Sequence, residues 1–556
     1  MKKIQGNQKD KVFIEKPASL PEAQEAFSEI KASAGKQKGF LEAQGNRPQK
    51  HPLHNVDPFT TILPFLCIAA LCLLFIVWPG QSSRALGAVR GFLGNELGSY
   101  YLVIGLGVFL LSLYIAFSRY GRIRLGGRKE RPKYSNLSWG AMMFTSGLAA
   151  DILFYSLCEW MLYADDPYVK GLGSMQDWAS TFPLFHWGPI PWGFYATLAA
   201  CFGFMLHVRG CQKQKYSEAC RPILGKYTDG IPGKLIDLLA VFALLAGTAT
   251  TFSLATPLLS EAFSGLFGIP GGKWLTIGIL LFVCLVYTLS VMRGMRGVRF
   301  LANICMYLFF ALLIYVFLFG GESVYILETG IAAVGNLAQN FLRLSTYTDP
   351  LRTSYFPQNW TIFYWAYWMV WCVAAPFFMG SISRGRTIKE VVLGAYIFGV
   401  SATFISFIVL GNYSLGLQMH GLLDVTGLYA AGGDLYAVIL AILDTLPLSK
   451  LVLFLLALSM IAFYATSFDS ITLVASAYSY RRMSGGQEAS GGMKLFWAIL
   501  LILLPIALIF SENSMNHLQT VSIIAAFPIA LVILLIIASF FKDARRYLGE
   551  AGDLQG

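Results

Sequence analysis

Charged side chains are scarce in this chain of 556 residues: Asp, Glu, Lys and Arg make up only 13% of it, whereas hydrophobic residues make up 56%. A typical globular domain is about 25% charged, so the composition excludes a cytosolic enzyme, a disordered chain and a disulfide-rich secreted domain. The nine cysteines form no Cys-x-x-Cys pair, the six histidines form no His-Glu-x-x-His motif, and no phosphate-binding loop occurs. The absence of these motifs argues against an enzyme and against a bound metal or cofactor. The composition is that of a polytopic membrane protein.

Long apolar runs dominate the sequence instead. Twelve of them have about 20 residues, the length with which an α-helix crosses a bilayer: 59–78, 100–119, 138–163, 187–208, 236–262, 274–292, 300–320, 359–382, 390–411, 450–480, 493–511 and 517–541. Clusters of Lys and Arg follow the even-numbered runs, so the positive-inside rule predicts that both termini lie on the cytoplasmic side of the membrane. The net charge of +11 resides in these loops and therefore does not indicate a nucleic-acid partner.

Three segments lie outside these runs. Residues 1–50 hold ten Lys or Arg and six acids without an apolar signal segment, which predicts a polar cytoplasmic tail with one short helix near Leu20–Ala34. The tail either takes part in sensing or is simply solvated. The stretch 324–344 is amphipathic, which predicts a helix along the membrane surface. The Gly-rich stretch 412–449 predicts an outer loop with partial helix.

The third apolar run contains two acids. Asp151, Tyr155 and Glu159 are four residues apart and therefore share a helix face. A carboxylate within the membrane costs about 2.5–3.5 kcal/mol, so Asp151 near mid-span indicates an ion or proton site, or an acid that is hydrogen-bonded to a neighbouring helix. Glu159 lies nearer the outer face, where a structural role is commoner. Small residues around Gly147 allow close backbone approach or a helix break.

The tenth run carries hydroxyl groups beside a third acid: Thr466, Ser467, Asp469 and Ser470. Oxygen ligands of this kind at mid-membrane bind Na⁺ or satisfy freed backbone groups. The sequence leaves these two alternatives open.

Aromatic side chains gather in the fourth and eighth runs. Trp187, Trp192 and Tyr195 fall within about 140° of arc on a helical wheel, and a second stripe is formed by Tyr364, Tyr367, Trp368 and Trp371. Aromatic faces attract quaternary ammonium groups, although Trp and Tyr also form belts at membrane interfaces. Pro376 predicts a helix break beside the second stripe, as in transporters, which favours a cage for an ammonium group.

Five stretches resemble the betaine/choline/carnitine transporter family: FHWGPIPW (Phe185–Trp192), FYWAYWMVW (Phe363–Trp371), SISRGRT (Ser381–Thr387), GVRFLAN (Gly297–Asn303) and LATPLLSEAFSGLFGIP (Leu254–Pro270). The resemblance runs from about residue 55 to 545, and its long tryptophan-rich motif is very specific. FHWGPIP, YTDP and FPQNWTIFYWA are most similar to the carnitine branch.

The resemblance implies an all-α integral membrane protein with twelve transmembrane helices and a leucine-transporter-like fold. Two additional N-terminal helices would lie within 51–125, and two inverted five-helix repeats would occupy 126–322 and 359–541. A surface helix and loop, 323–358, would separate the repeats, and 542–556 would be a cytoplasmic tail. Members are commonly trimeric, so we expect a homotrimer.

The resemblance also implies a substrate site between the third, fourth and eighth spans. The cage positions of the family fall on Trp187, Trp192, Tyr195, Tyr367, Trp368 and Trp371. Most members carry Trp where Tyr367 stands. A Tyr at this position preserves an aromatic cage, but the change from Trp can alter which substrate is selected.

Coupling positions can be compared in the same way. Sodium-coupled betaine carriers have a Gly-Met-Gly-Ile-Gly run in the third span, and Asp151 replaces its last glycine. Proton-coupled choline carriers also have an acid there, and a carboxylate in low dielectric can hold a proton, so H⁺ is favoured over Na⁺. Thr466 and Ser467 match the second sodium site of sodium-coupled members, but the altered third span should spoil that site.

A second branch shares one position with this chain. Arg299 stands where sodium-independent carnitine exchangers use an arginine as a fixed cation. Those exchangers have Met where Ala375 stands and Tyr where Leu162 stands, so the chain follows no branch throughout.

We therefore expect a secondary transporter that imports a trimethylammonium compound such as choline, carnitine or glycine betaine, coupled to protons. The alternative is an exchanger that swaps two related amines without net ion flow.

Overall fold

The structure is a computed structural model that describes residues 55–127, 129–211, 213–432, 434–481, 483, 488–510 and 515–553. The chain divides into two units, Met1–Asn55 and Val56–Gly556, and the helices described below belong to the second unit. The expected tail over 1–50, with its short helix near Leu20–Ala34, lies outside the described residues. The described residues are helical apart from loops and isolated β-bridges.

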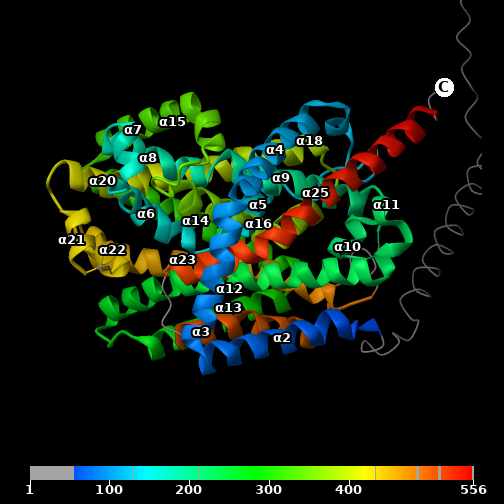
Figure 1. Cartoon of the computed structure of the whole chain (residues 1–556), viewed down its shortest axis with the longest axis horizontal. Coiled ribbons are helices and arrows are strands. Elements are labelled where there is room, and N and C mark those ends of the chain that lie inside the picture. Colours follow the sequence, from blue (N-terminus) through cyan, green and yellow to red (C-terminus); the bar gives the residue numbers. More distant parts are fainter. Residues whose placement is uncertain are drawn as a thin grey trace, which may run out of the picture. The chain divides into compact units, whose positions relative to one another are not determined.

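Long apolar helices make up most of the second unit (Figure 1). Within the described residues, eight helical segments are long and apolar enough to cross a membrane, or ten when two bent pairs are counted as one span each. All twelve expected runs lie on helices or on these bent pairs, whereas the number of true spans and the inverted repeats stay predictions. Nine of the expected runs correspond to single helices: α2 (Pro58–Val77), α4 (Gly98–Phe117), α9 (Pro189–His207), α12 (Ile231–Phe267), α13 (Lys273–Met292), α14 (Met295–Phe319), α23 (Ser449–Tyr478), α24 (Gly491–Phe510) and α25 (Met515–Asp553). The ninth run is a chain of short helices within Ile388–Met419.

The first bent pair joins α5 (Asn136–Gly147) to α6 (Asp151–Ala164) at an angle of 62°. The small residues predicted to permit a break lie at this bend. Ser467 of α23 donates hydrogen bonds to the carbonyl oxygens of Thr145, at 3.1 Å, and Leu148, at 2.6 Å. The break therefore exposes backbone acceptors that a distant helix satisfies.

The second bent pair joins Pro357–Trp371, which ends in α16 (Ile362–Trp371), to α17 (Ala375–Ile382) at 49°. Pro376 lies in the first turn of α17 and has no N–H to offer the carbonyl of Cys372, four residues earlier. The hydroxyl of Tyr216 donates to that carbonyl instead. The expected break beside Trp371 thus occurs, and a third segment of the chain supports it.

Several helices connect or cover these elements. The amphipathic stretch forms α15 (Ser323–Thr346), which packs on α8 (Met175–His186), while its place at a membrane surface stays a prediction. The expected outer loop over 412–449 is more helical than predicted, with α20 (Asn412–Met419), α21 (Val425–Gly432) and α22 (Leu435–Asp444).

The C-terminal helix is longer than expected. Residues 542–553 of the predicted cytoplasmic tail continue α25, which passes α12 and α16 and reaches α10 (Tyr216–Ala219) and α11 (Arg221–Leu224) near the C-terminus (Figure 1).

Candidate functional site

Four of the predicted cage residues form one buried ring cluster. Trp187 follows the last turn of α8, Trp192 and Tyr195 lie on α9, and Trp368 lies on α16. The Trp368 ring centroid lies 5.7 Å from that of Trp187, 5.7 Å from that of Trp192 and 4.9 Å from that of Tyr195. The structure therefore brings the two predicted aromatic stripes into contact around Trp368.

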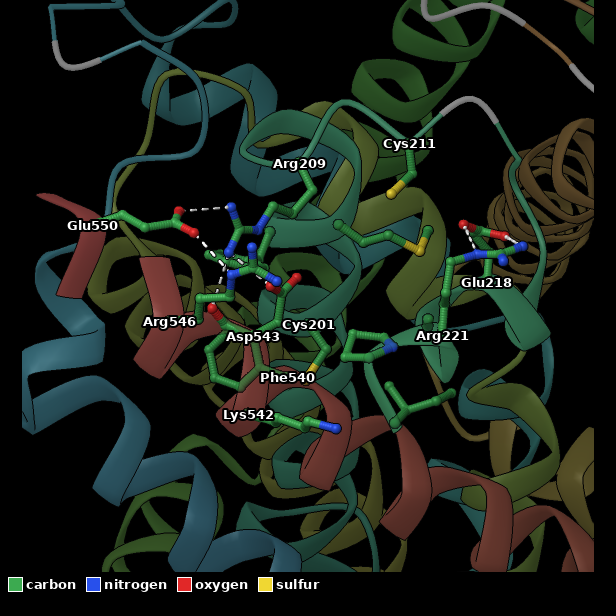
Figure 2. A pocket seen from close by; sticks show the side chains of 15 residues that line it. Cys201, Arg209, Cys211, Glu218, Arg221, Phe540, Lys542, Asp543, Arg546 and Glu550 are labelled. Carbon is green, nitrogen blue, oxygen red and sulfur yellow. Dashed lines mark hydrogen bonds and ion pairs between the residues drawn. The ribbon is translucent and has the colours of Figure 1, made fainter. Parts of the chain in front are cut away.

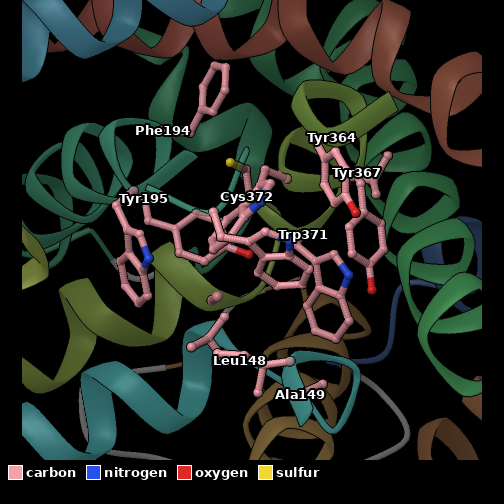
Figure 3. Packing of buried hydrophobic residues seen from close by; sticks show 14 of the residues in the cluster. Leu148, Ala149, Phe194, Tyr195, Tyr364, Tyr367, Trp371 and Cys372 are labelled. Atoms are coloured by element: carbon pink, nitrogen blue, oxygen red, sulfur yellow. The ribbon is translucent and has the colours of Figure 1, made fainter. Parts of the chain in front are cut away.

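A cavity adjoins this cluster at the bend between α5 and α6. Figure 3 shows Leu148 and Ala149 of the bend beside the rings of Tyr195, Tyr367 and Trp371. The cavity is lined by Gly147, Leu148, Ala149, Asp151, Trp187, Tyr195, Tyr367, Trp368 and Trp371. Its free volume is about 10 Å³, which is about the space of one water molecule. Five of the six predicted cage residues line it, and Trp192 packs behind them.

Two glycines allow Trp192 to lie where it does. A Cβ atom on Gly147 would come within 2.9 Å of the Trp192 ring and within 3.2 Å of the Tyr195 ring. A Cβ atom on Gly399, in η6 (Ala395–Val400), would come within 2.3 Å of the Trp192 ring. The absence of side chains at these two positions therefore makes room for the indole on both sides.

Glu159 holds one ring of the cluster. Its Oε2 accepts a hydrogen bond of 2.7 Å from the indole N–H of Trp187, and its Oε1 accepts one of 2.6 Å from the hydroxyl of Tyr163. The Tyr163 oxygen lies 2.8 Å from Nδ1 of His186, whose Nε2 lies 3.1 Å from the Thr361 hydroxyl. This buried chain orients Trp187. Sequence reasoning gave Glu159 a structural role but missed its partners, and its only signal was the face shared with Asp151.

Asp151 is the only acidic residue among the described residues that line the cavity. It begins α6 and is 3% exposed, and its carboxylate accepts a hydrogen bond from the Tyr367 hydroxyl. The Tyr367 hydroxyl also contacts the Thr251 hydroxyl. The positive end of the α6 dipole favours negative charge at this position. In the described part of the chain Asp151 forms no ion pair, so a bound cation or a proton is what can neutralise it.

The other predicted coupling residues are placed differently. Ser467 adjoins the α5–α6 bend, where its hydroxyl hydrogen-bonds to the carbonyl oxygens of the bend, and its role in ion coupling stays a prediction. The Thr466 hydroxyl donates to the Phe463 carbonyl at 3.0 Å and lies 3.9 Å from Cys305 Sγ. Arg299 is exposed on α14 and does not line the cavity. The structure therefore brings only Asp151 and Ser467 of this group to the bend.

A separate cavity of about 400 Å³ lies between α9, the α10–α11 segment and α25. Figure 2 shows Arg209 between Asp543 and Glu550, with which it forms ion pairs of 2.7 and 3.4 Å. Arg221 pairs with Glu218 at 2.6 Å. The Arg209 pairs link the end of α9 to α25, and the Arg221 pair lies within the α10–α11 segment.

Comparisons with known proteins cover nearly the same range as the resemblance in the sequence. The family model of betaine/carnitine/choline transporters matches residues 59–548. The glycine betaine transporter OpuD of Bacillus subtilis (strain 168) is 31% identical over 485 residues, which cover 85% of this chain and 92% of the relative. A carnitine transporter of Acinetobacter baumannii is 28% identical over 481 residues, covering 85% and 87%. A solved Na⁺-coupled sialic acid symporter shares 14% identity at a TM-score of 0.45, covering 79% of this chain and 86% of its own.

Proposed function

The chain belongs to the betaine/carnitine/choline family of transporters, which are not enzymes, and on this premise we propose that it imports a trimethylammonium compound together with a proton. The observation that carries the proposal is the position of Asp151, a buried carboxylate on the wall of a cavity that is otherwise lined by rings, small residues and one leucine.

The ring cluster suits a methylated ammonium head group. Such a group has no N–H to donate, so it is held by aromatic faces within about 6 Å of the ring centroid, and the contact is worth about 2 kcal/mol when desolvated. Trp187, Tyr195 and Trp368 supply such faces from two segments of the chain. The hydrogen bond from Trp187 to Glu159 keeps one of these rings in a fixed orientation.

Asp151 suits proton coupling. A carboxylate removed from water is costly unless it is paired or protonated. The Tyr367 hydroxyl hydrogen-bonds to it on the cavity wall, so loading and release of a proton at Asp151 would change the charge that faces the substrate. Choline, carnitine and glycine betaine share the head group, and an acid at this position favours a net cation such as choline.

Uptake into proteoliposomes tests the coupling. We expect concentrative uptake driven by a pH gradient alone, without sodium and without internal substrate. Asp151→Asn should abolish the pH-driven accumulation and keep substrate binding, measured by tryptophan fluorescence, within a few-fold. The matched control is Asp165→Asn at the exposed end of α6, where Asp165 pairs with Lys170; it should keep both properties.

Two outcomes would contradict proton symport. Uptake that needs internal counter-substrate would identify an exchanger, and pH-driven uptake that survives Asp151→Asn would remove Asp151 from the coupling step. Titration with choline, carnitine, glycine betaine and γ-butyrobetaine then identifies the substrate. We further propose a homotrimer in a bacterial-type inner membrane with both termini cytoplasmic, supported by the basic clusters and the family.

A further inference from the structure

One carboxyl group and two hydroxyl groups from three helices are hydrogen-bonded in a row beside the cavity of the ring cluster. Asp151 begins α6, Tyr367 lies on α16 and Thr251 lies in the middle of α12. The Tyr367 hydroxyl bonds both to the Asp151 carboxylate and to the Thr251 hydroxyl. These three side chains, which we call the buried trio, are at most 3% exposed. Their hydrogen bonds are therefore made within the protein and not with bulk water.

Thr251 is the member of the trio that has no assigned role. It does not line the cavity, and within the described residues its hydroxyl has one hydrogen-bond partner, the Tyr367 hydroxyl. A valine has nearly the same shape as a threonine but lacks the hydroxyl. Packing alone therefore does not require a hydroxyl on α12 at this position, whereas the bond to Tyr367 does.

The bonds of the trio have one direction when Asp151 is ionised. A carboxylate only accepts hydrogen bonds, whereas a hydroxyl both donates and accepts. Tyr367 therefore donates to Asp151, and its oxygen accepts from Thr251. The two hydroxyl protons fill the two contacts, so every donor of the trio is paired.

A proton on Asp151 allows the direction to reverse. The carboxyl group then donates to the Tyr367 oxygen, and Tyr367 donates to Thr251. The Thr251 proton needs an acceptor outside the trio, and a helical threonine reaches the carbonyl one turn earlier, which here belongs to Gly247. The neighbouring Thr250 makes a bond of this kind, to the Ala246 carbonyl at 3.0 Å. The added proton forms the one new covalent bond, and the hydroxyl groups only rotate.

The groups around Asp151 leave its own protonation as the change of charge at this site. Four tyrosines from four helices interact with the charge of Asp151: Tyr155 on α6, Tyr195 on α9, Tyr367 on α16 and Tyr464 on α23. Phenols are neutral near pH 7. Farther along α6, Glu159 is bonded to Tyr163, which lies against His186 of α8. Cys158 of α6 and Tyr436 of α22 are the other titratable groups on this side.

We propose that Thr251 is a positioning residue for the coupling proton: it donates to Tyr367 when Asp151 is ionised and accepts from Tyr367 when Asp151 is protonated. The inference rests on the proposed proton coupling and adds a residue from a third helix to it. Thr251 does not touch Asp151, so it acts through the direction of the Tyr367 hydroxyl.

Two substitutions should shift the protonation of Asp151 in opposite directions. In Thr251→Val, Tyr367 still donates to the ionised carboxylate, but the protonated state has two donors for one contact and leaves one of them unpaired. The pH at which Asp151 is half protonated should therefore fall by about one unit, a tenfold change in the equilibrium. Thr251→Ser should restore it. Tyr367→Phe removes a hydrogen bond to the charged form, which is the stronger kind, and should raise the midpoint.

Infrared difference spectroscopy of the purified full chain tests the proposal, because it follows the carbonyl stretch of protonated carboxyl groups against pH. The band that is lost in Asp151→Asn identifies Asp151. Thr256→Val is the matched control, since Thr256 lies on α12, is 1% exposed and has its hydroxyl 3.0 Å from that of Tyr464. It should leave the midpoint of Asp151 unchanged. The pH profile of uptake should move with the spectroscopic midpoint in each variant.

A double variant tests whether Thr251 acts through Tyr367. Thr251→Val should add no further shift in the Tyr367→Phe background, and a further shift of about one unit there overturns the proposal. An unchanged midpoint in Thr251→Val overturns it, as do an equal shift in Thr256→Val, a failure of Thr251→Ser to restore the midpoint, and an Asp151 band that does not respond to pH. Thermal unfolding checks each variant, and Thr251→Ala, with the same expected direction, replaces Thr251→Val if that variant does not fold.

The spectroscopic readout does not depend on transport, so failure of this inference and failure of proton symport are distinguishable. A lowered midpoint in Thr251→Val together with uptake that needs internal counter-substrate supports the role of Thr251 and contradicts symport. An unchanged midpoint together with uptake driven by a pH gradient supports symport and overturns the role of Thr251.

Discussion

The substitution Gly399→Ala tests whether the position of Trp192 controls substrate binding. A methyl group on Gly399 would lie 2.3 to 2.4 Å from three atoms of the Trp192 indole, where ordinary contact begins at 3.4 Å. The ring or η6 must therefore move by about 1 Å, and protein interiors are too densely packed to absorb this freely. Overpacking of this kind costs about 1–3 kcal/mol. Because Trp192 contacts both Tyr195 and Trp368, the displacement passes to the cage.

The expected result is a loss of affinity of about tenfold or more, since a displacement of about 1 Å at a positioned group costs up to about 100-fold. Tryptophan-fluorescence titration with the four trimethylammonium compounds measures the affinity, and thermal unfolding measures the stability. Gly335→Ala on α15 is the control, because its Cβ atom would meet nothing within 4 Å. That control should bind normally and gain up to about 1 kcal/mol of stability.

A second substitution identifies the clash. Adding Trp192→Phe to Gly399→Ala replaces the indole that the methyl group strikes with a smaller ring. The double variant should therefore lose less stability than the sum of the losses in the two single variants. The reasoning fails if Gly399→Ala binds and unfolds like Gly335→Ala. Normal stability would mean that the Trp192 ring can move away from the added methyl group without cost, and normal binding would mean that the position of Trp192 does not affect the binding surface.

Two further substitutions test contacts away from the cage. Tyr216→Phe removes the hydroxyl that donates to the Cys372 carbonyl, and thermal unfolding should show a loss of about 1–3 kcal/mol because that buried acceptor is left unpaired; unchanged stability would contradict this role. Lys215→Met removes a buried cation 2.7 Å from Asp57 and should cost about 3–5 kcal/mol at pH 7, whereas exposed Lys226→Met should cost nothing measurable. Burial raises the pKa of the Asp57 carboxyl, but the hydrogen bond and charge of Lys215 outweigh it and hold the pKa below its ordinary value. The stabilisation is therefore present above about pH 4 and lost as the pH falls below it, so the difference between wild type and Lys215→Met should shrink in acid, and a constant difference would contradict the pairing.

The breaks of the two bent helix pairs differ in how far the sequence predicts them. Pro376 has no backbone N–H to donate to the carbonyl of Cys372, so a break between Trp371 and Ala375 follows from local chemistry alone. The groups that stabilise the breaks are not local, because Tyr216 lies 156 residues from Cys372 and Ser467 lies 319 residues from Leu148. Helical periodicity places a residue on a face but does not determine which distant helix meets that face.

The same limit applies to the candidate site. The spacing of the aromatic residues predicts two stripes, and the structure brings them together around Trp368. Glu159 shares a face with Asp151 in the sequence, yet its bond to Trp187 arises because α6 packs on α8. Only a family position indicates Arg299, and the fold leaves it exposed, so its coupling role stays a prediction without support from this geometry.

The cavity at the ring cluster is too small for a substrate, so some of the rings that line it must move before a substrate can bind. Its volume of about 10 Å³ admits about one water molecule, so a trimethylammonium group enters only when the rings separate. Trp192 is confined by the backbone at Gly147 and Gly399, and Trp187 is held by Glu159. Trp368 contacts both of these rings and Tyr195, and its indole N–H has no hydrogen-bond partner. A shift of α16, which ends at the break before α17, therefore opens all three ring contacts at once without breaking a hydrogen bond of the Trp368 side chain.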